Sequence, residues 1–132
     1  MFLPTIDLEN LSVNEIRLGV DGETKIDDID SFYYAVHNHP DNSCLSLGDL
    51  INFLKRRNML GLEAIGNNGY NSSIIIKTFE SNVDEYNGFI LNEIDKFDNE
   101  HPDYNVENDF DLANDFCKMI LKKGEEYGFK IK

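Results

Sequence analysis

The amino-acid sequence predicts one α/β domain over residues 1–132, in which a mixed β-sheet packs with helices. The chain length gives room for one compact domain, and 41% hydrophobic residues, with 11% aromatic residues, are enough to form a core. Apolar runs typical of strands give way to helical periodicity beyond Glu80, which sets the class. We expect a core over about residues 13–78 and a helical segment over about residues 80–132.

The first elements are expected to be strands. Residues 16–20 and 24–26 flank Asp21-Gly22, a pair that tolerates the positive φ angles of a tight turn, so they predict a hairpin. Residues 32–36 are aromatic or β-favouring and predict a largely buried strand. This strand is expected to end before the loop that follows Pro40, because proline lacks a backbone N–H donor.

A helix is predicted from Leu47 to about Asn58. Ser46 is its expected N-cap, and Asp49 lies three residues later, as in a capping box. Apolar residues then recur at helical spacing at Leu47, Leu50, Ile51 and Leu54. The capping geometry would turn the Asp49 side chain back toward the preceding strand.

Two further strands are predicted at residues 62–65 and 73–78. They are joined through Gly66-Asn67-Asn68-Gly69, a strong turn signal. With the early hairpin and the strand at residues 32–36, the sheet is expected to have at least four strands.

Two helices are expected to close the chain. One apolar helical face is formed by Val83, Tyr86, Ile90, Ile94 and Phe97, and a second by Phe110, Ala113, Cys117, Ile120 and Gly124. His101-Pro102 should end the first of these helices, and Gly128 is a candidate C-cap after the second.

Composition and charge bear on the partners. The formal net charge of −13 would repel a nucleic-acid backbone, and the basic residues at 55–57 and 122–123 are best explained as solvated helix ends, so no nucleic-acid partner is expected. No run of about 18 apolar residues and no secretory signal is found, so we expect a cytoplasmic protein without membrane contact.

The two cysteines, Cys44 and Cys117, lie far apart in the sequence and are expected to be reduced thiols. Cys44 lies in the loop after Pro40, and its simplest role is that of a small buried hydrophobic residue. An extra metal ligand or a redox-sensitive inhibitory role for Cys44 stays open.

A zinc site is predicted around His37, His39 and Asp49. Residues two apart on a strand point to the same side, so His37 and His39 would present both imidazoles at the end of the strand. Asp49, in the first turn of the next helix, can supply the third ligand. Two histidines and one carboxylate leave one position of a tetrahedral zinc ion open for water.

The same residues resemble the motif of the JAMM (MPN) zinc metalloprotease family. His37-Asn38-His39-Pro40, five further residues and Ser46-Leu47-Gly48-Asp49 are similar to its His-x-His-Pro and Ser-x-x-Asp segments. The pattern is closest to that of RadC-like proteins and of short bacterial and phage members. The resemblance covers roughly residues 13–78 and implies an MPN-type, cytidine-deaminase-like α/β fold with two additional C-terminal helices.

What the resemblance implies is a zinc-dependent hydrolase that cleaves a peptide or isopeptide bond in a protein or peptide substrate. A glutamate would take the proton of the zinc-activated water, and Ser46 would support the developing oxyanion. Glu9, Glu15 and Glu23 are the candidates for this glutamate, and Glu15 is preferred because it begins the first hairpin strand. The alternative is an MPN-like module that binds metal or a protein partner without catalysis.

Overall fold

The computed structural model describes residues 31–68, 72–105 and 108–132. In this part of the chain the elements run in the order β1 (Tyr33–His39), α1 (Leu47–Lys55), β2 (Met59–Gly66), β3 (Ser72–Ile76), α2 (Val83–Glu100), α3 (Phe110–Lys123), a 3-10 helix (Gly124–Tyr127) and β4 (Lys130–Ile131). Helices and strands are both present, as the predicted α/β class requires. The predicted hairpin at residues 16–26 lies outside the described residues.

The described strands form one mixed sheet in the order β1-β2-β3-β4. β1 and β2 are parallel, whereas β2 pairs with β3, and β3 with β4, in antiparallel fashion. Parallel neighbours need a crossover connection, and α1 provides it between β1 and β2. The start of α1 therefore lies near the carboxyl end of β1.

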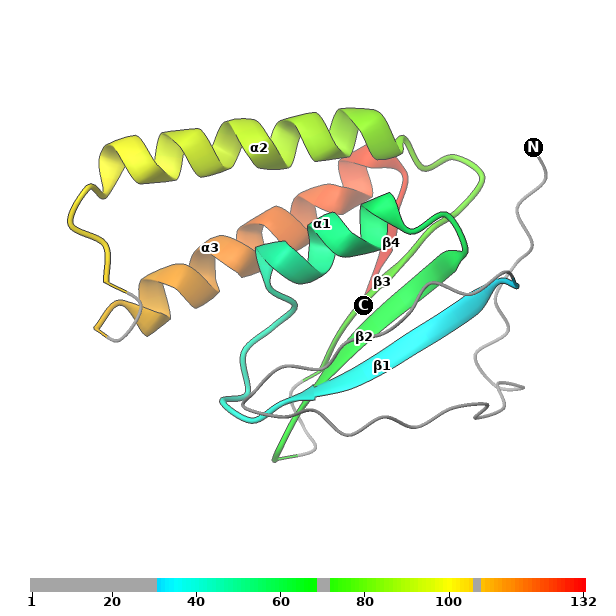
Figure 1. The fold of residues 1–132 in the computed structure, drawn as a ribbon, viewed down its shortest axis with the longest axis horizontal. Coiled ribbons are helices and arrows are strands. Elements are labelled where there is room, and N and C mark those ends of the chain that lie inside the picture. Colours follow the sequence, from blue (N-terminus) through cyan, green and yellow to red (C-terminus); the bar gives the residue numbers. More distant parts are fainter. Residues whose placement is uncertain (1–30, 69–71, 106–107) are drawn as a thin grey trace.

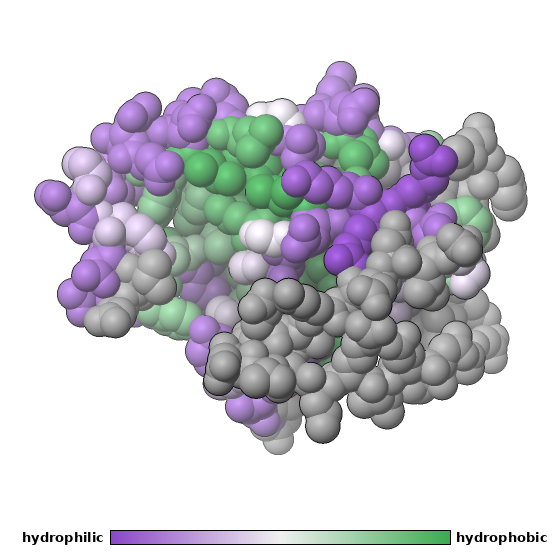
Figure 2. All heavy atoms as spheres, viewed as in Figure 1, coloured by the Kyte–Doolittle hydropathy of each residue, from purple (hydrophilic) through white to green (hydrophobic). Residues whose placement is uncertain are grey.

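The three α-helices lie on one face of the sheet (Figure 1). The core forms between them, where Ala35, Leu62 and Ile75 of the sheet belong to one buried cluster with helix residues such as Phe53. Tyr86 of α2 is fully buried, and its hydroxyl donates to the carbonyl of Ile120 in α3 at 2.7 Å. Hydrophobic side chains gather where the helices meet, with hydrophilic side chains around them (Figure 2).

Strand β1 corrects one expectation, because it is not largely buried. Only Ala35 is buried within it, and Val36 is 50% exposed. Of the described strands β1 pairs with β2 alone, and the helices cover one face of the sheet, so alternate residues of β1 face away from the helices. His37 and His39 share the face of Ala35, toward the helices.

The end of α1 and the start of β2 also differ from the prediction. α1 ends at Lys55 rather than near Asn58, and β2 begins at Met59 rather than at Leu62. The ammonium group of Lys77, just after β3, donates to the carbonyls of Phe53 and Arg56, each at 2.7 Å. A distant residue thus binds carbonyl groups at the C-terminus of α1, which no local pattern shows.

The C-terminal region follows the prediction and adds one strand. α2 ends at its C-cap His101, and α3 continues into the 3-10 helix that Gly128 caps with a φ of 87°. β4 was not expected, and it pairs Lys130 and Ile131 with β3. No helix of the described segments combines the length and the apolar character needed to cross a membrane.

Candidate metal centre

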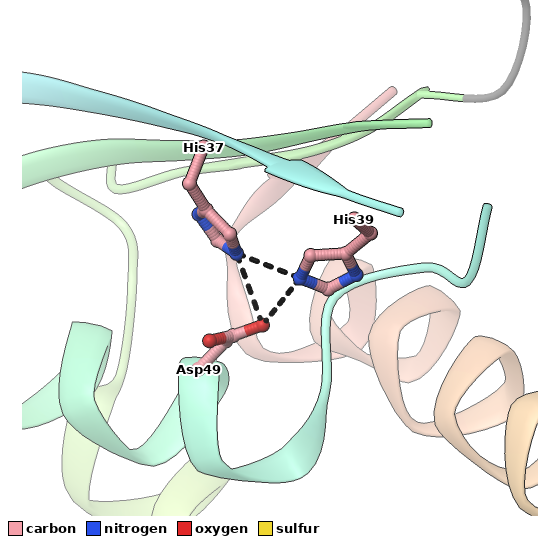
Figure 3. A group of neighbouring side chains, drawn as sticks. All are labelled: His37, His39 and Asp49. Carbon is pink, nitrogen blue, oxygen red and sulfur yellow. Dashed lines mark hydrogen bonds and ion pairs between the residues drawn. The ribbon is translucent and has the colours of Figure 1, made fainter. Parts of the chain in front are cut away.

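His37, His39 and Asp49 point toward a common point between β1 and α1 (Figure 3). The Nε2 atoms of the two histidines are 2.7 Å apart. Oδ2 of Asp49 lies 3.4 Å from Nε2 of His37 and 3.2 Å from Nε2 of His39. Among the described residues, these three form the group of histidine, cysteine and acidic side chains that could hold a metal ion.

The strand and the helix each fix their part of this group. His37 and His39 project to one side of β1 because side chains alternate along a strand. Asp49 is held by a complete capping box, in which the Ser46 backbone N–H donates to Asp49 Oδ2 at 3.0 Å and the Asp49 N–H donates to Ser46 Oγ at 3.1 Å. The predicted cap therefore also aims the predicted ligand.

A second layer of contacts orients the His39 ring. Nδ1 of His39 lies 3.1 Å from the carbonyl oxygen of Ser43 and 3.0 Å from its Oγ. Because a carbonyl oxygen can only accept, Nδ1 carries a proton, and Nε2 is the nitrogen that could bind a metal once it has lost its own proton. Ser43 Oγ in turn donates to Oδ1 of Asp41 at 2.6 Å.

Sequence reasoning missed Ser43 and Asp41. Both lie in the loop between β1 and α1, where polar residues are common for other reasons, and no spacing rule links them to His39. The only signal was the small-polar character of residues 41–45.

Asp49 and His39 shift each other's pKa values. Burial acts to raise the pKa of Asp49, but hydrogen bonds with His37 and His39 and with the Ser46 backbone outweigh it and hold this pKa well below its usual range. The hydrogen bond with Asp49 raises the pKa of His39, against the opposing effect of burial. The carboxylate is therefore ionised and available as a metal ligand.

The donor set and its spacing fit a zinc ion. Bonds of about 2.0–2.1 Å in a tetrahedral arrangement place ligand atoms about 3.3 Å apart. The two distances from Asp49 match this value, and only the two imidazole nitrogens, now 2.7 Å apart, have to separate, by about 0.6 Å. Zinc-type coordination needs only this small adjustment of the two imidazole rings.

A cavity of about 460 Å³ lies beside the three residues. Asn52 and Arg56 of the α1 region and Met59 and Leu62 of β2 line it together with the histidine loop, and Ser46 is also on its wall. The site stands at the carboxyl end of β1, the end of a parallel strand at which α/β proteins commonly bind ligands. The three clustered side chains therefore face an open cavity.

The other predicted site residues are placed as follows. Ser46 is next to the centre, whereas Glu9, Glu15 and Glu23 lie outside the described residues. None of the glutamates that the structure describes lines the cavity. Cys44 is half-buried rather than fully buried, and it is not among the three clustered metal-binding side chains.

Comparisons with known proteins give no match: no family model matches the sequence, and neither does any curated protein or solved structure.

Proposed function

We propose that this chain is a zinc-dependent hydrolase of the JAMM type that cleaves a peptide or isopeptide bond. The observation that supports it best is the convergence of two imidazole nitrogens and one carboxylate oxygen, all within 4.8 Å of one another, beside a cavity. The spacing of these residues in the sequence matches the family motif independently of that geometry. The order β1-α1-β2-β3 around the motif supports an MPN-type core over about residues 13–78.

Each residue has a definite task in this proposal. His37, His39 and Asp49 hold the metal, and Ser43 keeps the His39 ring in its metal-binding orientation. A bound zinc ion would act as a Lewis acid on a carbonyl and lower the pKa of a water molecule. Ser46 accepts the Asp49 N–H through its oxygen, which leaves its hydroxyl hydrogen to be donated to a substrate oxyanion. Glu15 is proposed as the residue that accepts and returns the proton.

The first test is the zinc content of the purified protein. We expect stoichiometric zinc in the wild type and its loss in His37→Ala and Asp49→Ala, because each removes one of three ligands. Asp84→Ala is the matched control, since Asp84 is an exposed carboxylate in the first turn of α2 and should leave zinc binding unchanged. Wild-type protein that binds no zinc would overturn the proposal.

A second candidate is a metal-binding module that does not hydrolyse. The observation that favours it is the lack of a glutamate on the cavity wall among the described residues. Hydrolysis of a peptide library by wild type and by Glu15→Gln separates the two functions. If the chain is a hydrolase, both proteins should retain zinc, and Glu15→Gln should lose cleavage. Zinc binding without cleavage in the wild type would establish the non-catalytic metal-binding module.

A further inference from the structure

Two thiols that are far apart in the sequence meet beside the metal centre. Cys44 lies in the loop between β1 and α1, and Cys117 lies in α3. The Cys44 backbone N–H donates to Oδ1 of Asn114 at 3.2 Å, and the Cys44 thiol lies 3.9 Å from the Asn114 carbonyl oxygen. Asn114 is one helical turn before Cys117 on α3, so these contacts bring the two cysteines close together.

The two sulfur atoms have different surroundings. The Cys44 thiol and the backbone of Leu47, the first residue of α1, are the neighbours that act on the Cys117 sulfur. These contacts lower the pKa of Cys117, as is usual for a sulfur at a helix N-terminus, whereas the pKa of Cys44 is raised. Cys117 is therefore the more readily ionised thiol of the pair, and a second thiol beside it can resolve its oxidised form, as in reversibly oxidised cysteine pairs.

The two cysteines lie next to residues that position the proposed metal ligands. Cys44 follows Ser43, whose carbonyl and hydroxyl oxygens hold the His39 ring. Leu47, whose backbone is one of the groups that lower the pKa of Cys117, begins the helix turn that contains Asp49. A change in the separation of the two sulfur atoms therefore moves the backbone that positions two of the three proposed ligands.

We propose that Cys44 and Cys117 form a reversible disulfide under peroxide, and that this bond lowers the metal affinity of the centre. Its effect on the metal rests on the proposed function, whereas the formation of the bond does not. An S–S bond of about 2.05 Å is much shorter than any non-bonded contact between two sulfur atoms, so oxidation draws the loop of Ser43 toward α3. Loss of contacts that orient a metal-binding histidine typically weakens metal binding about 10–100-fold.

The chemistry is a two-electron oxidation by hydrogen peroxide. The Cys117 sulfur attacks one peroxide oxygen, the O–O bond breaks, and the other oxygen leaves as hydroxide and takes a proton from solvent. Cys117 is then a sulfenic acid, and the Cys44 sulfur attacks it and displaces the oxygen, which leaves as water with the Cys44 thiol proton. The two thiols lose two electrons and the peroxide is reduced to two waters.

The bond itself is tested on zinc-free protein. After exposure to hydrogen peroxide and blocking of free thiols, peptide mapping should show Cys44 linked to Cys117, and dithiothreitol should reverse the link. In Cys44→Ser, Cys117 should instead proceed to sulfinic acid, because its resolving thiol is missing. In Cys117→Ser, Cys44 should stay reduced. Wild-type protein that gives no linked peptide while its far-UV circular dichroism is native would overturn the proposal.

The effect of the disulfide on the metal centre is measured once without metal and once with it. On oxidation of zinc-free protein the ring NMR signals of His39 should shift, whereas those of His101, at the far end of α2, should not. Zinc affinity should fall about 10-fold or more in the oxidised wild type and stay constant in Cys44→Ala. An unchanged His39 signal and an unchanged zinc affinity in oxidised protein would overturn the regulation. Failure of the reduced protein to bind zinc would instead count against the hydrolase, and the disulfide would still be decided by the mapping.

Discussion

Asp49 joins the start of a helix to the metal centre through one oxygen atom. Its Oδ2 accepts the backbone N–H of Ser46 and faces Nε2 of both His37 and His39. The helix N-terminus favours this negative charge, and the two imidazoles add to the effect. A residue that only capped the helix would not need histidines within 3.4 Å of its carboxylate.

Ser43 provides the first test at the scale of a residue. Ser43→Ala removes the hydroxyl between His39 Nδ1 and Asp41 but keeps the carbonyl contact with His39. We expect zinc affinity to fall by about 10-fold, the low end of the usual effect of such supporting contacts. Competition with a chromophoric chelator measures the change.

The control for this variant is Ser72→Ala, because Ser72 is an exposed serine at the start of β3 and does not line the cavity beside the centre. Ser43→Thr keeps a hydroxyl and should recover most of the affinity. Equal zinc affinity in wild type and Ser43→Ala would show that the carbonyl contact alone orients His39.

The three proposed ligands could be predicted from the sequence, but their supporting residues could not. Alternation along a strand and the capping box place His37, His39 and Asp49 by local rules. Ser43 contacts His39 from an irregular loop, and Cys117 lies near Cys44 only because α3 contacts that loop through Asn114. Contacts of this kind depend on tertiary structure, which no spacing rule describes.

Among the elements, α1 has a start that depends on local residues and an end that depends on a distant one. Its start was predicted correctly at Leu47, because Ser46 and Asp49 form a local cap. Its end was predicted three residues too late, because the carbonyls of Phe53 and Arg56 are bound by Lys77 from the segment after β3. The helix that presents Asp49 is therefore fixed at both ends by side chains.

The two N-caps of α1 and α2 allow the capping role of Ser46 to be separated from its proposed chemistry. Ser46 Oγ accepts the N–H of Asp49, and Asn82 Oδ1 accepts the N–H of Glu85, each at 3.1 Å. We expect Ser46→Ala and Asn82→Ala each to lower the free energy of unfolding by about 1 kcal/mol, as measured by urea denaturation. Zinc affinity should fall in Ser46→Ala alone.

Hydrolysis extends this comparison. Ser46→Asn keeps an N-cap side chain but moves the hydrogen-bond donor, so stability should be retained while the rate of cleavage falls. If Ser46→Asn cleaves peptides at the wild-type rate, Ser46 is a cap and has no part in oxyanion support.

At the scale of the whole molecule, the order of the elements was predictable where each has its own pattern. The helical periodicities gave α2 and α3, and the apolar runs gave β1, β2 and β3. β4 has two residues and no pattern of its own, and it exists because the chain after Gly128 returns to pair with β3. The burial of β1 was overestimated because a run of aromatic residues does not show which strands lie beside it.

The coupling of Asp49 to His39 has a consequence for the pH dependence of the whole protein. In the metal-free chain the pKa of His39 is raised above 6.5, so its contribution to stability is fully present below pH 6.5 and is lost as the pH rises through the raised value. The pKa of Asp49 is lowered, so its contribution is present above its usual pKa of 3.8 and is lost only as the pH falls below that value. Zinc binding has the opposite trend, because the ion must displace the proton of His39.

We therefore expect the stabilisation by zinc to increase with pH across the range in which His39 loses its proton. The measurement is the difference in thermal unfolding temperature between protein with excess zinc and protein with a chelator, taken from about pH 5 to about pH 8. In His101→Gln the increase should persist, because His101 caps α2 away from the centre, whereas in His39→Gln it should be lost. A zinc-induced shift of equal size at every pH would show that no proton leaves His39 when the metal binds.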